Sequence, residues 1–528
     1  MPFHPTTSQL LPCCPAVTAL LLASTLVGAC ALPTPDDRQA ASAPREAGST
    51  EPGNMHQNGV YYDSGGTHRH APPDNDIGPL LVELEAAWEP ARELVEAELD
   101  IALDDVSLVL TTDAIMLNEV ERETRRLANS QFTSPRFATR FTRQLVDQSN
   151  GTYVALYTAR QKRILLSRRL LGHYLNSLDS FNDSNTNGDA PGGGGLATTG
   201  RRHSSRHSAL LSLLIHELVH AADDKRHGTH ANRALNFRAS FAESATFEGH
   251  AQYVTRRICR QEGCLDGLES LDELMFGTAR SPNRMMQPVE AISRNVLEYS
   301  YVEGERFITA LAERENGAAL LQTILSEPPT DPIQILAPAS YPDTARENRN
   351  QRLVDTAVGT ARHWQSGNWQ MVETSPLKGV NLRADPARRE AAIDGFTRLI
   401  TAMVAMQLYD TDTPDAPPVE ISILQTESDV TAELFAESLY RNSILAGALP
   451  GPGWYTSTFS SHSSVLRAAG TDWPLTLRRT HVDGTPPYRS TMASAGQYTI
   501  QVSAAVTDPA MIENYARRLL SALLDAAT

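Results

Sequence analysis

Two histidines and a glutamate in one short segment carry the clearest chemistry in this sequence. The segment is His216-Glu217-Leu218-Val219-His220, near the end of the apolar run Ala209 to Ala222. On an α-helix, residues four apart lie on the same face, so both imidazoles can bind one metal ion. Glu217 lies beside them, where a carboxylate can take a proton from metal-bound water. The segment predicts an HExxH site for Zn²⁺; the alternative is a buried helix that carries two histidines by chance.

The residues after His220 indicate where a third ligand must come from. Metzincins require a glycine and a histidine at positions that are Asp223 and Arg226 here, so that class of zinc site is excluded. A second helix should then supply the ligand, as in gluzincins, and the segment 241–254 offers Glu243 and Glu248. These residues are about 140° apart around a helix axis, so both cannot face one metal ion.

Glu248 is the predicted third ligand because small residues flank it and let its backbone approach the first helix: Ala245, Gly249 and Ala251. Gln252, one turn on, and Asp224, one turn beyond His220, are placed to hydrogen-bond a metal ligand. Solvation at the surface is the alternative for both. His250 points away from Glu248, and we do not expect it to bind the metal.

Tyr301 is a candidate for a second catalytic role. Zinc peptidases place a Tyr or His donor where negative charge develops on the substrate oxygen, and a tyrosine on a third helix near the cleft would suit. The alternative is a tyrosine that packs in the core.

The metal motif and the segments after it resemble a group of poorly characterised bacterial zincin-like lipoproteins. The shared pattern is His-Glu-Leu-Val-His-Ala, then Glu-Gly-x-Ala, then Tyr-x-x-Gly-x-x-Phe from Tyr301 to Phe307, then Pro-Pro-Thr at 328–330. The resemblance covers roughly residues 80–345. It implies a gluzincin fold with zinc on His216, His220 and Glu248 and with Glu217 as base, and it implies little about substrate. His250 stands where this group more often has Asp.

The N-terminus predicts export and a lipid anchor. Ala16 to Ala29 is an unbroken run of apolar and small residues, too short to span a bilayer but long enough for a signal-peptide core. It ends in Gly28-Ala29-Cys30, which resembles the lipobox of bacterial lipoproteins, although residues 1–15 contain no Lys or Arg. We expect an envelope lipoprotein acylated at Cys30, held at the outer membrane or cell surface. Plain secretion or a periplasmic location is the alternative.

The remaining cysteines fit an exported protein. Cys13 and Cys14 leave with the signal peptide, so Cys259 and Cys264 are an even pair that can form a disulfide in an oxidising compartment. The formal net charge of −16 argues against a nucleic-acid partner. Away from the N-terminus there is no apolar stretch of membrane-spanning length, so the expected membrane contact is the lipid at Cys30.

The chain divides into a signal peptide (1–30), a flexible linker (31–77), a zincin-like metallopeptidase domain (78–345) and a C-terminal domain of unknown role (346–528). The predicted class is α+β, with a mainly helical first domain that has a small sheet and a smaller α+β second domain. A polar insertion at 176–208 is either a mobile lid or functionless. Predicted helices are 79–100, 117–128, 388–408, 434–445 and 511–526. Predicted strands are 152–158, 163–166, 475–479 and 497–502, with 164–166 either an edge strand beside the cleft or an ordinary core strand.

These features predict an extracytoplasmic zinc metallohydrolase that cleaves amide bonds in a peptide or protein, or in a peptidoglycan peptide. Glu217 favours catalysis, because a structural zinc needs no base and normally takes four protein ligands. The alternative is a non-enzymatic envelope lipoprotein that uses a zincin scaffold for structure or for partner binding.

Overall fold

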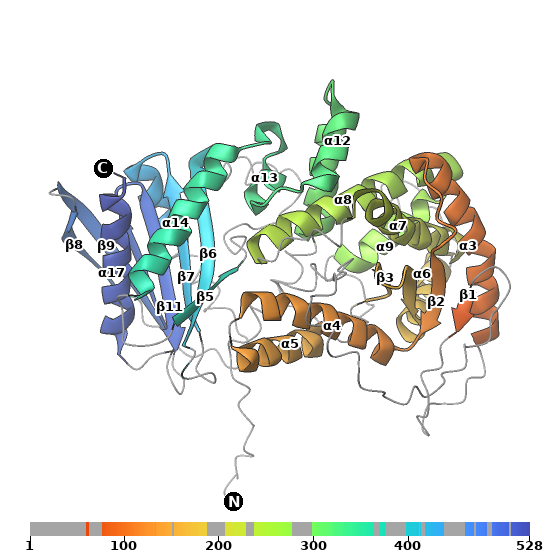
Figure 1. Ribbon diagram of the computed structural model, residues 1–528, viewed down its shortest axis with the longest axis horizontal. Helices are drawn as coiled ribbons and strands as arrows, with labels where there is room; N and C mark the ends of the chain where they lie inside the picture. The colour runs from red at the N-terminus through yellow and green to blue at the C-terminus, as the bar shows by residue number, and fades with distance from the viewer. Residues whose placement is uncertain are drawn as a thin grey trace, which may run out of the picture.

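The computed structural model describes residues 60–62, 77–132, 134–149, 153–186, 206–228, 237–276, 298–362, 369–374, 398–410, 412, 418–437, 460–468, 471–482, 488–505 and 508–527. The predicted signal peptide with Cys30 and most of the predicted linker lie outside these residues. Two sheets lie toward opposite ends of the long axis, with helices between them (Figure 1). The α+β class predicted from the sequence is confirmed.

A buried helix, α7 (Arg206–His227), is the centre of the first half of the molecule. Every residue from Ser208 to Asp223 is buried, because apolar side chains lie on all sides of this helix. α3 (Ile77–Leu99) packs along it through residues spaced three and four apart, among them Leu84, Trp88 and Ala91. α8 (Phe237–Glu262) and α9 (Leu265–Phe276) pack on its other sides.

A four-stranded sheet lies beside these helices in the order β1-β2-β4-β3. Its strands are β1 (Val60–Tyr62), β2 (Ser107–Thr111), β3 (Ala155–Thr158) and β4 (Arg163–Ser167). β2 pairs in parallel with β1 and β4, whereas β3 is antiparallel and forms one edge. Residues 164–166 are therefore an interior strand and not the edge. β1 also corrects the predicted linker, because three β-forming residues of that linker pair with β2.

Three further helices follow the first strands: α4 (Asp113–Gln131), α5 (Pro135–Ser149) and α6 (Arg168–Thr186). α4 and α5 form a hairpin whose end contacts the C-terminal sheet through an aromatic cluster of Phe132, Phe137, Phe141 and Tyr409. α6 and α7 occupy both ends of the predicted insertion 176–208, and residues 187–205 lie outside the described part. The insertion was predicted too long because α6 is polar, although Leu178 packs in the core.

Short helices between residues 298 and 340 join the two halves. They are the π-helix η3 (Glu298–Glu303), α11 (Gly304–Ala312), α12 (Gly317–Ser326), α13 (Pro332–Leu336) and the 3₁₀ turn η4 (Pro338–Ser340). One apolar cluster contains Phe241 of α8 and Phe307 of α11 together with Met403 and Leu424 of the C-terminal sheet. The hydrophobic core therefore continues from one half into the other.

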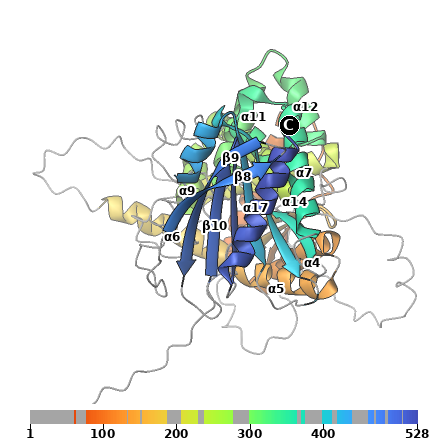
Figure 2. The same ribbon diagram turned by 90° about the vertical axis from the view of Figure 1, so that its left-hand side faces the viewer.

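The C-terminal half is built on a seven-stranded antiparallel sheet in the order β5-β6-β7-β11-β10-β9-β8. Figure 2 shows α14 and α17 lying across one face of it; their buried side chains and those of the sheet form one core. The elements are α14 (Thr344–Arg362), β5 (Trp369–Thr374), β6 (Ile400–Asp410), β7 (Val419–Thr426), β8 (Ser460–Ala468), β9 (Thr471–Val482), β10 (Tyr488–Ala495), β11 (Tyr498–Ala505) and α17 (Pro509–Asp525).

The sequence predictions for this half hold in part. The strands at 475–479 and 497–502 and the final helix are present as β9, β11 and α17. The predicted helix 388–408 is wrong over its C-terminal part, which is strand β6. Residues 402–409 of β6 are all buried, so its apolar residues fill both faces of a strand and not one face of a helix. The helix predicted at 434–445 begins earlier, over residues 429–437, and its later residues lie outside the described part.

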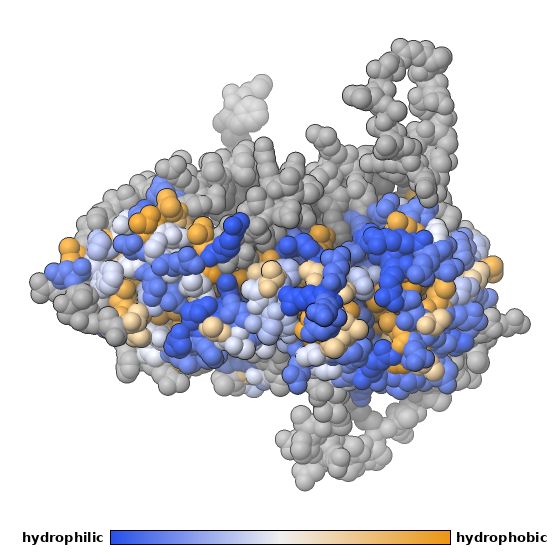
Figure 3. Space-filling model, turned by 90° about the horizontal axis from the view of Figure 1, so that it is seen from above, coloured by the Kyte–Doolittle hydropathy of each residue, from blue (hydrophilic) through white to orange (hydrophobic). Residues whose placement is uncertain are grey.

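The surface seen from above is mainly hydrophilic, with apolar residues scattered across it (Figure 3). Among the described residues, no helix has both the length and the apolar character needed to cross a bilayer.

α8 and the η3–α11 segment touch through two glycines. A Cβ atom on Gly249 would lie 2.2 Å from the carbonyl carbon of Gly304, and one on Gly304 would lie 2.2 Å from the carbonyl oxygen of Ala245. Both contacted atoms belong to the backbone, so a change of side-chain rotamer cannot relieve the clash. This contact requires the glycines that the sequence places at 249 and 304.

We predict that Gly304→Ala lowers the free energy of unfolding by about 1–3 kcal/mol, the usual cost of overpacking. Gly359→Ala is the matched control: Gly359 lies in α14, and a Cβ there meets no atom within 4 Å. Because alanine favours helix over glycine, that change should stabilise the protein by up to about 1 kcal/mol. Urea unfolding measures both. Equal effects of the two substitutions would contradict the close contact.

Candidate metal centre

α7 brings His216 and His220 together on one face, as their spacing predicts. Both side chains are buried, at 5% and 2% exposure. Their ring centroids are 4.9 Å apart, and the two Nε2 atoms are separated by 3.2 Å. Two imidazole nitrogens thus point at the same place in a part of the molecule from which solvent is largely excluded.

Glu248 of α8 completes the group, and Glu243 lies outside it. Its Oε2 atom is 3.2 Å from Nε2 of His216 and 3.3 Å from Nε2 of His220. Ligand atoms on a tetrahedral zinc ion, with bonds of about 2.0–2.1 Å, lie roughly 3.3 Å from one another. The three atoms therefore have the separations of one face of such a site. In the described part of the chain, this is the one cluster of three or more His, Cys, Asp or Glu side chains with ligand atoms so close.

The charges of these residues also suit a cation. Burial by itself would raise the pKa of Glu248, but His220 and the hydrogen bonds to both histidines lower it to about 2. Burial would lower the pKa of His220, and the carboxylate of Glu248 outweighs this and leaves it raised. Glu248 is therefore an anion at 1% exposure, and a buried anion needs a positive partner. Protonated imidazole or a metal ion meets that need.

Glu217 lies beside this group and is also buried. Burial is the main reason that the pKa of Glu217 is raised, and His220 and His216 oppose the rise. The carboxylate accepts a hydrogen bond from the backbone N–H of Tyr157 in the edge strand β3. Within the described part of the chain, three buried atoms at the site have no hydrogen-bond partner: Oε2 of Glu217, Oε1 of Glu248 and Nδ1 of His216. The site thus has polar atoms that the described residues do not satisfy.

The structure places Tyr301 at the same site. Its ring stacks on His216, with centroids 5.7 Å apart and planes 20° apart, and its hydroxyl is hydrogen-bonded to Glu248. Burial, followed by the charges of Glu248 and Glu217, raises the pKa of Tyr301 well above its usual value, so the hydroxyl stays protonated as a donor. The contact between Gly249 and Gly304 holds the Tyr301 segment against the helix that carries Glu248.

The small residues near Glu248 have a different role from the one predicted. Gly249 admits Gly304 of α11, which also touches the backbone of Ala245, and Ala245 packs in the cluster that contains Phe307 of α11. Ala251 belongs to the core cluster that contains α7, so the prediction holds for that residue alone. Small residues on α8 allow close contact with either α7 or α11, so the sequence could not show which of these two helices they contact.

The two residues predicted to support a metal ligand make hydrogen bonds to other residues. The side-chain amide of Gln252 donates to Asp272 of α9 at 2.6 Å, in a network that also includes Arg256 and Glu305. Asp224 accepts a hydrogen bond from the hydroxyl of Tyr157 at 3.2 Å. The hydrogen bond of Gln252 therefore joins α8 to α9.

Sequence reasoning missed a pair of buried residues next to the ligands. Nδ1 of His250 donates to Oδ2 of Asp223 at 2.8 Å, and the side chains are 7% and 5% exposed. In the described structure, His250 belongs to no group of three or more potential metal ligands. The available signal was that Asp223 and His250 each lie within three residues of a predicted ligand.

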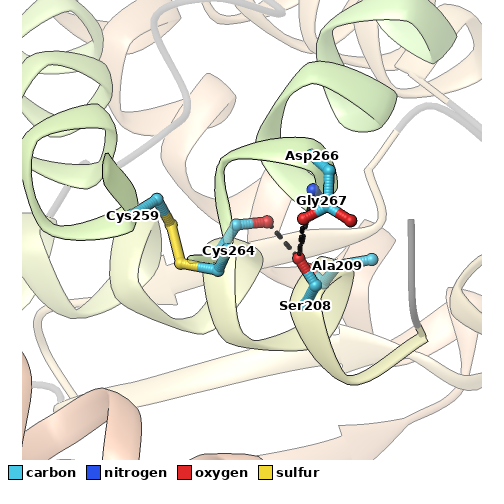
Figure 4. The surroundings of a disulfide bond; sticks show 7 residues. Ser208, Ala209, Cys259, Cys264, Asp266 and Gly267 are labelled. Atoms are coloured by element: carbon cyan, nitrogen blue, oxygen red, sulfur yellow. Dashed lines mark hydrogen bonds between the residues drawn. A yellow bond between two sulfur atoms is a disulfide. The ribbon is translucent and has the colours of Figure 1, made fainter. Parts of the chain in front are cut away.

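The disulfide between Cys259 and Cys264 joins the end of α8 to the start of α9 (Figure 4). At this point α9 touches the first turn of α7. The hydroxyl of Ser208 donates to Asp266, and the backbone N–H of Gly267 donates to Ser208. A Cβ on Gly267 would lie 2.4 Å from the carbonyl of Ser208, so the backbones are in direct contact. The disulfide therefore belongs to the scaffold that holds α7 and α8 together.

Comparisons with protein-family models, curated proteins and solved structures find no match for this chain. The resemblance to zincin-like lipoproteins therefore stays a prediction from the motifs, and the site is interpreted from its own geometry.

We predict that the two glutamates of α8 differ sharply in their effect on metal binding. Glu248→Gln removes the anionic oxygen and should weaken zinc binding by at least about 100-fold, since a direct ligand matters more than an outer partner worth about 10–100-fold. Glu243→Gln, also buried and on the same helix, should leave zinc affinity within about threefold of wild type. Competition with a chromophoric chelator measures both. Equal losses would show that Glu248 is not the ligand.

Proposed function

We propose that this chain is a zinc-dependent hydrolase of the peptidase type, in which His216, His220 and Glu248 hold the metal. The observation that carries the proposal is the convergence of two Nε2 atoms and one Oε2 atom within 3.3 Å of one another, beside the buried carboxylate of Glu217. Two imidazoles and a carboxylate are a donor set that suits zinc. Three protein ligands leave a fourth position open, as in catalytic zinc sites.

The elements around the proposed site have a gluzincin-like arrangement. The chain has the HExxH helix α7, a second helix that supplies a glutamate, and an antiparallel edge strand beside the site. That strand, β3, is tied to Glu217 through the N–H of Tyr157. These features support the likeness to gluzincins that the sequence motifs suggest.

The side chains at the site divide the chemistry between them. Bound zinc would lower the pKa of a coordinated water to about 7 and polarise the substrate carbonyl. Glu217 accepts the proton of the attacking water and passes it to the leaving amine, for which its raised pKa is suited. In this proposal the hydroxyl of Tyr301 leaves its hydrogen bond to Glu248 and donates instead to the oxygen on which negative charge develops.

The substrate in this proposal is an extended peptide. An edge strand binds such a segment by strand addition, and β3 offers that edge next to Glu217. A protein segment and a peptidoglycan peptide share this chemistry. The lipid anchor predicted at Cys30 would place the reaction in the bacterial envelope, where both are present.

Replacing Glu217 by Gln tests the proposal most directly. The amide cannot accept a proton, so kcat should fall by about 10³-fold while one zinc per chain is retained. Metal content is measured by mass spectrometry, and turnover on casein, short peptides and purified muropeptides. Cleavage of muropeptides alone would identify the peptidoglycan substrate.

Two results would contradict this assignment. Full activity of Glu217→Gln would remove Glu217 as the base. A wild-type protein that binds zinc and cleaves no member of the panel would favour a non-enzymatic role for the site.

Tyr301→Phe should lower kcat by about 10²-fold with little change in KM or in zinc content, because the lost hydrogen bond forms mainly in the transition state. Tyr299→Phe is the matched control from the same π-helix. The hydroxyl of Tyr299 donates to the carbonyl of Pro332 at 2.9 Å, away from the metal ligands, so this change should leave kcat unaltered. Steady-state kinetics on the best substrate compare the two. If both variants retained full kcat, Tyr301 would be a packing residue.

A further inference from the structure

Asp223 and His250 form a buried contact that the proposed reaction does not use. Asp223 lies on α7 three residues after His220, and His250 lies on α8 two residues after Glu248. The contact is 2.8 Å long, and both side chains are less than one tenth exposed. It therefore joins the two helices that supply the three predicted ligands, close to those ligands on each helix.

The two polar contacts between α7 and α8 lie on opposite sides of an apolar one. Ala251, Val254 and Ile258 of α8 belong to the core cluster that contains α7. By the 3.6-residue repeat, Ala251 points between Glu248 and His250 around the axis of α8. Glu248 reaches α7 at His216 and His220 on one side of this stripe, and His250 reaches α7 at Asp223 on the other.

Contacts on both sides of a packed stripe restrict rotation of a helix about its own axis. An atom roughly 6 Å from the axis moves by about 1 Å when the helix rotates by about 10°. A functional site needs its groups held within roughly 0.5 Å of their working positions. The apolar contacts of the Ala, Val and Ile side chains have no preferred direction. A hydrogen bond between a ring N–H and a carboxylate, in contrast, is directional.

We propose that the hydrogen bond between His250 and Asp223 sets the rotation of α8 and thereby positions Glu248 for metal binding. The pair acts through Glu248 and touches neither metal nor substrate. This inference rests on the metal site of the proposed function and not on hydrolysis. A pair that merely stabilises the fold would affect unfolding without affecting metal affinity, and this difference makes the proposal testable.

The test compares variants that keep or remove the directional contact in the full-length protein. In His250→Asn the side-chain amide places an N–H near the position of Nδ1, so the bond to Asp223 is kept. The double variant Asp223→Leu with His250→Phe removes both partners, which avoids leaving a buried charge without a partner. Ser208→Ala is the control, because it removes a buried contact between α7 and α9 instead.

Three measurements are made on each variant: zinc affinity by chelator competition, the visible absorption spectrum of the cobalt(II)-substituted protein, and the melting temperature without metal. We expect the double variant to bind zinc about tenfold more weakly, because loss of a residue that supports a metal ligand usually weakens metal binding by about 10–100-fold. We also expect its cobalt spectrum to change. His250→Asn and Ser208→Ala should both keep wild-type affinity to within about twofold, whatever their melting temperatures.

Each contrary outcome has one meaning. Wild-type affinity and spectrum in the double variant would overturn the inference and leave the proposed function standing. Equal losses of affinity in His250→Asn and the double variant, or in Ser208→Ala, would also overturn it, because the effect would then not depend on this contact. If the wild type binds zinc and the variants show the expected losses, but the wild type hydrolyses no substrate, the inference is supported and the proposed peptidase activity is excluded. No zinc binding by wild type would overturn both.

Discussion

The buried carboxylate of Glu248 is the constraint on which the rest of the site depends. An anion at 1% exposure is costly unless positive charge lies against it, and here two imidazoles lie within 3.3 Å of one oxygen. The three groups must come from two different helices, so α7 and α8 have to be held at a fixed distance and rotation. Much of the first half of the molecule can be understood as the means of holding them.

Several independent contacts serve that purpose. Apolar residues on every side of α7 bury it completely, which fixes its place in the core. The Cys259–Cys264 disulfide joins the end of α8 to the start of α9, and α9 packs against α7. The glycines at 249 and 304 bring the Tyr301 segment against α8 at a distance that no larger residue permits. The three candidate metal ligands are thus a small part of the structure that holds this site in place.

The ligand geometry was predictable from the sequence because it is set by local periodicity. His216 and His220 lie on one helix face by their spacing alone. The 3.6-residue repeat excluded a site that uses both Glu243 and Glu248, and Glu248 was chosen because small residues flank it. The partners of Gln252, Asp223 and His250 were not predictable, because they depend on how helices cross, which no single segment encodes. The strand β6 was misread for a related reason: a strand buried on both faces has no alternation to distinguish it from a helix. β1 was missed because three residues are too few to carry a pattern.

The edge strand β3 also carries a risk for the protein that contains it. If β3 binds a peptide by strand addition, as proposed, its edge can also pair with other strands, including an edge strand of a second copy, and such edges promote aggregation. Natural proteins usually block them with proline, lysine or a bulge, but any of these beside Glu217 would obstruct the proposed peptide substrate as well. β3 contains four residues, Ala155–Thr158, and pairs with β4 along its whole length. Its shortness limits how much unwanted strand pairing it can support.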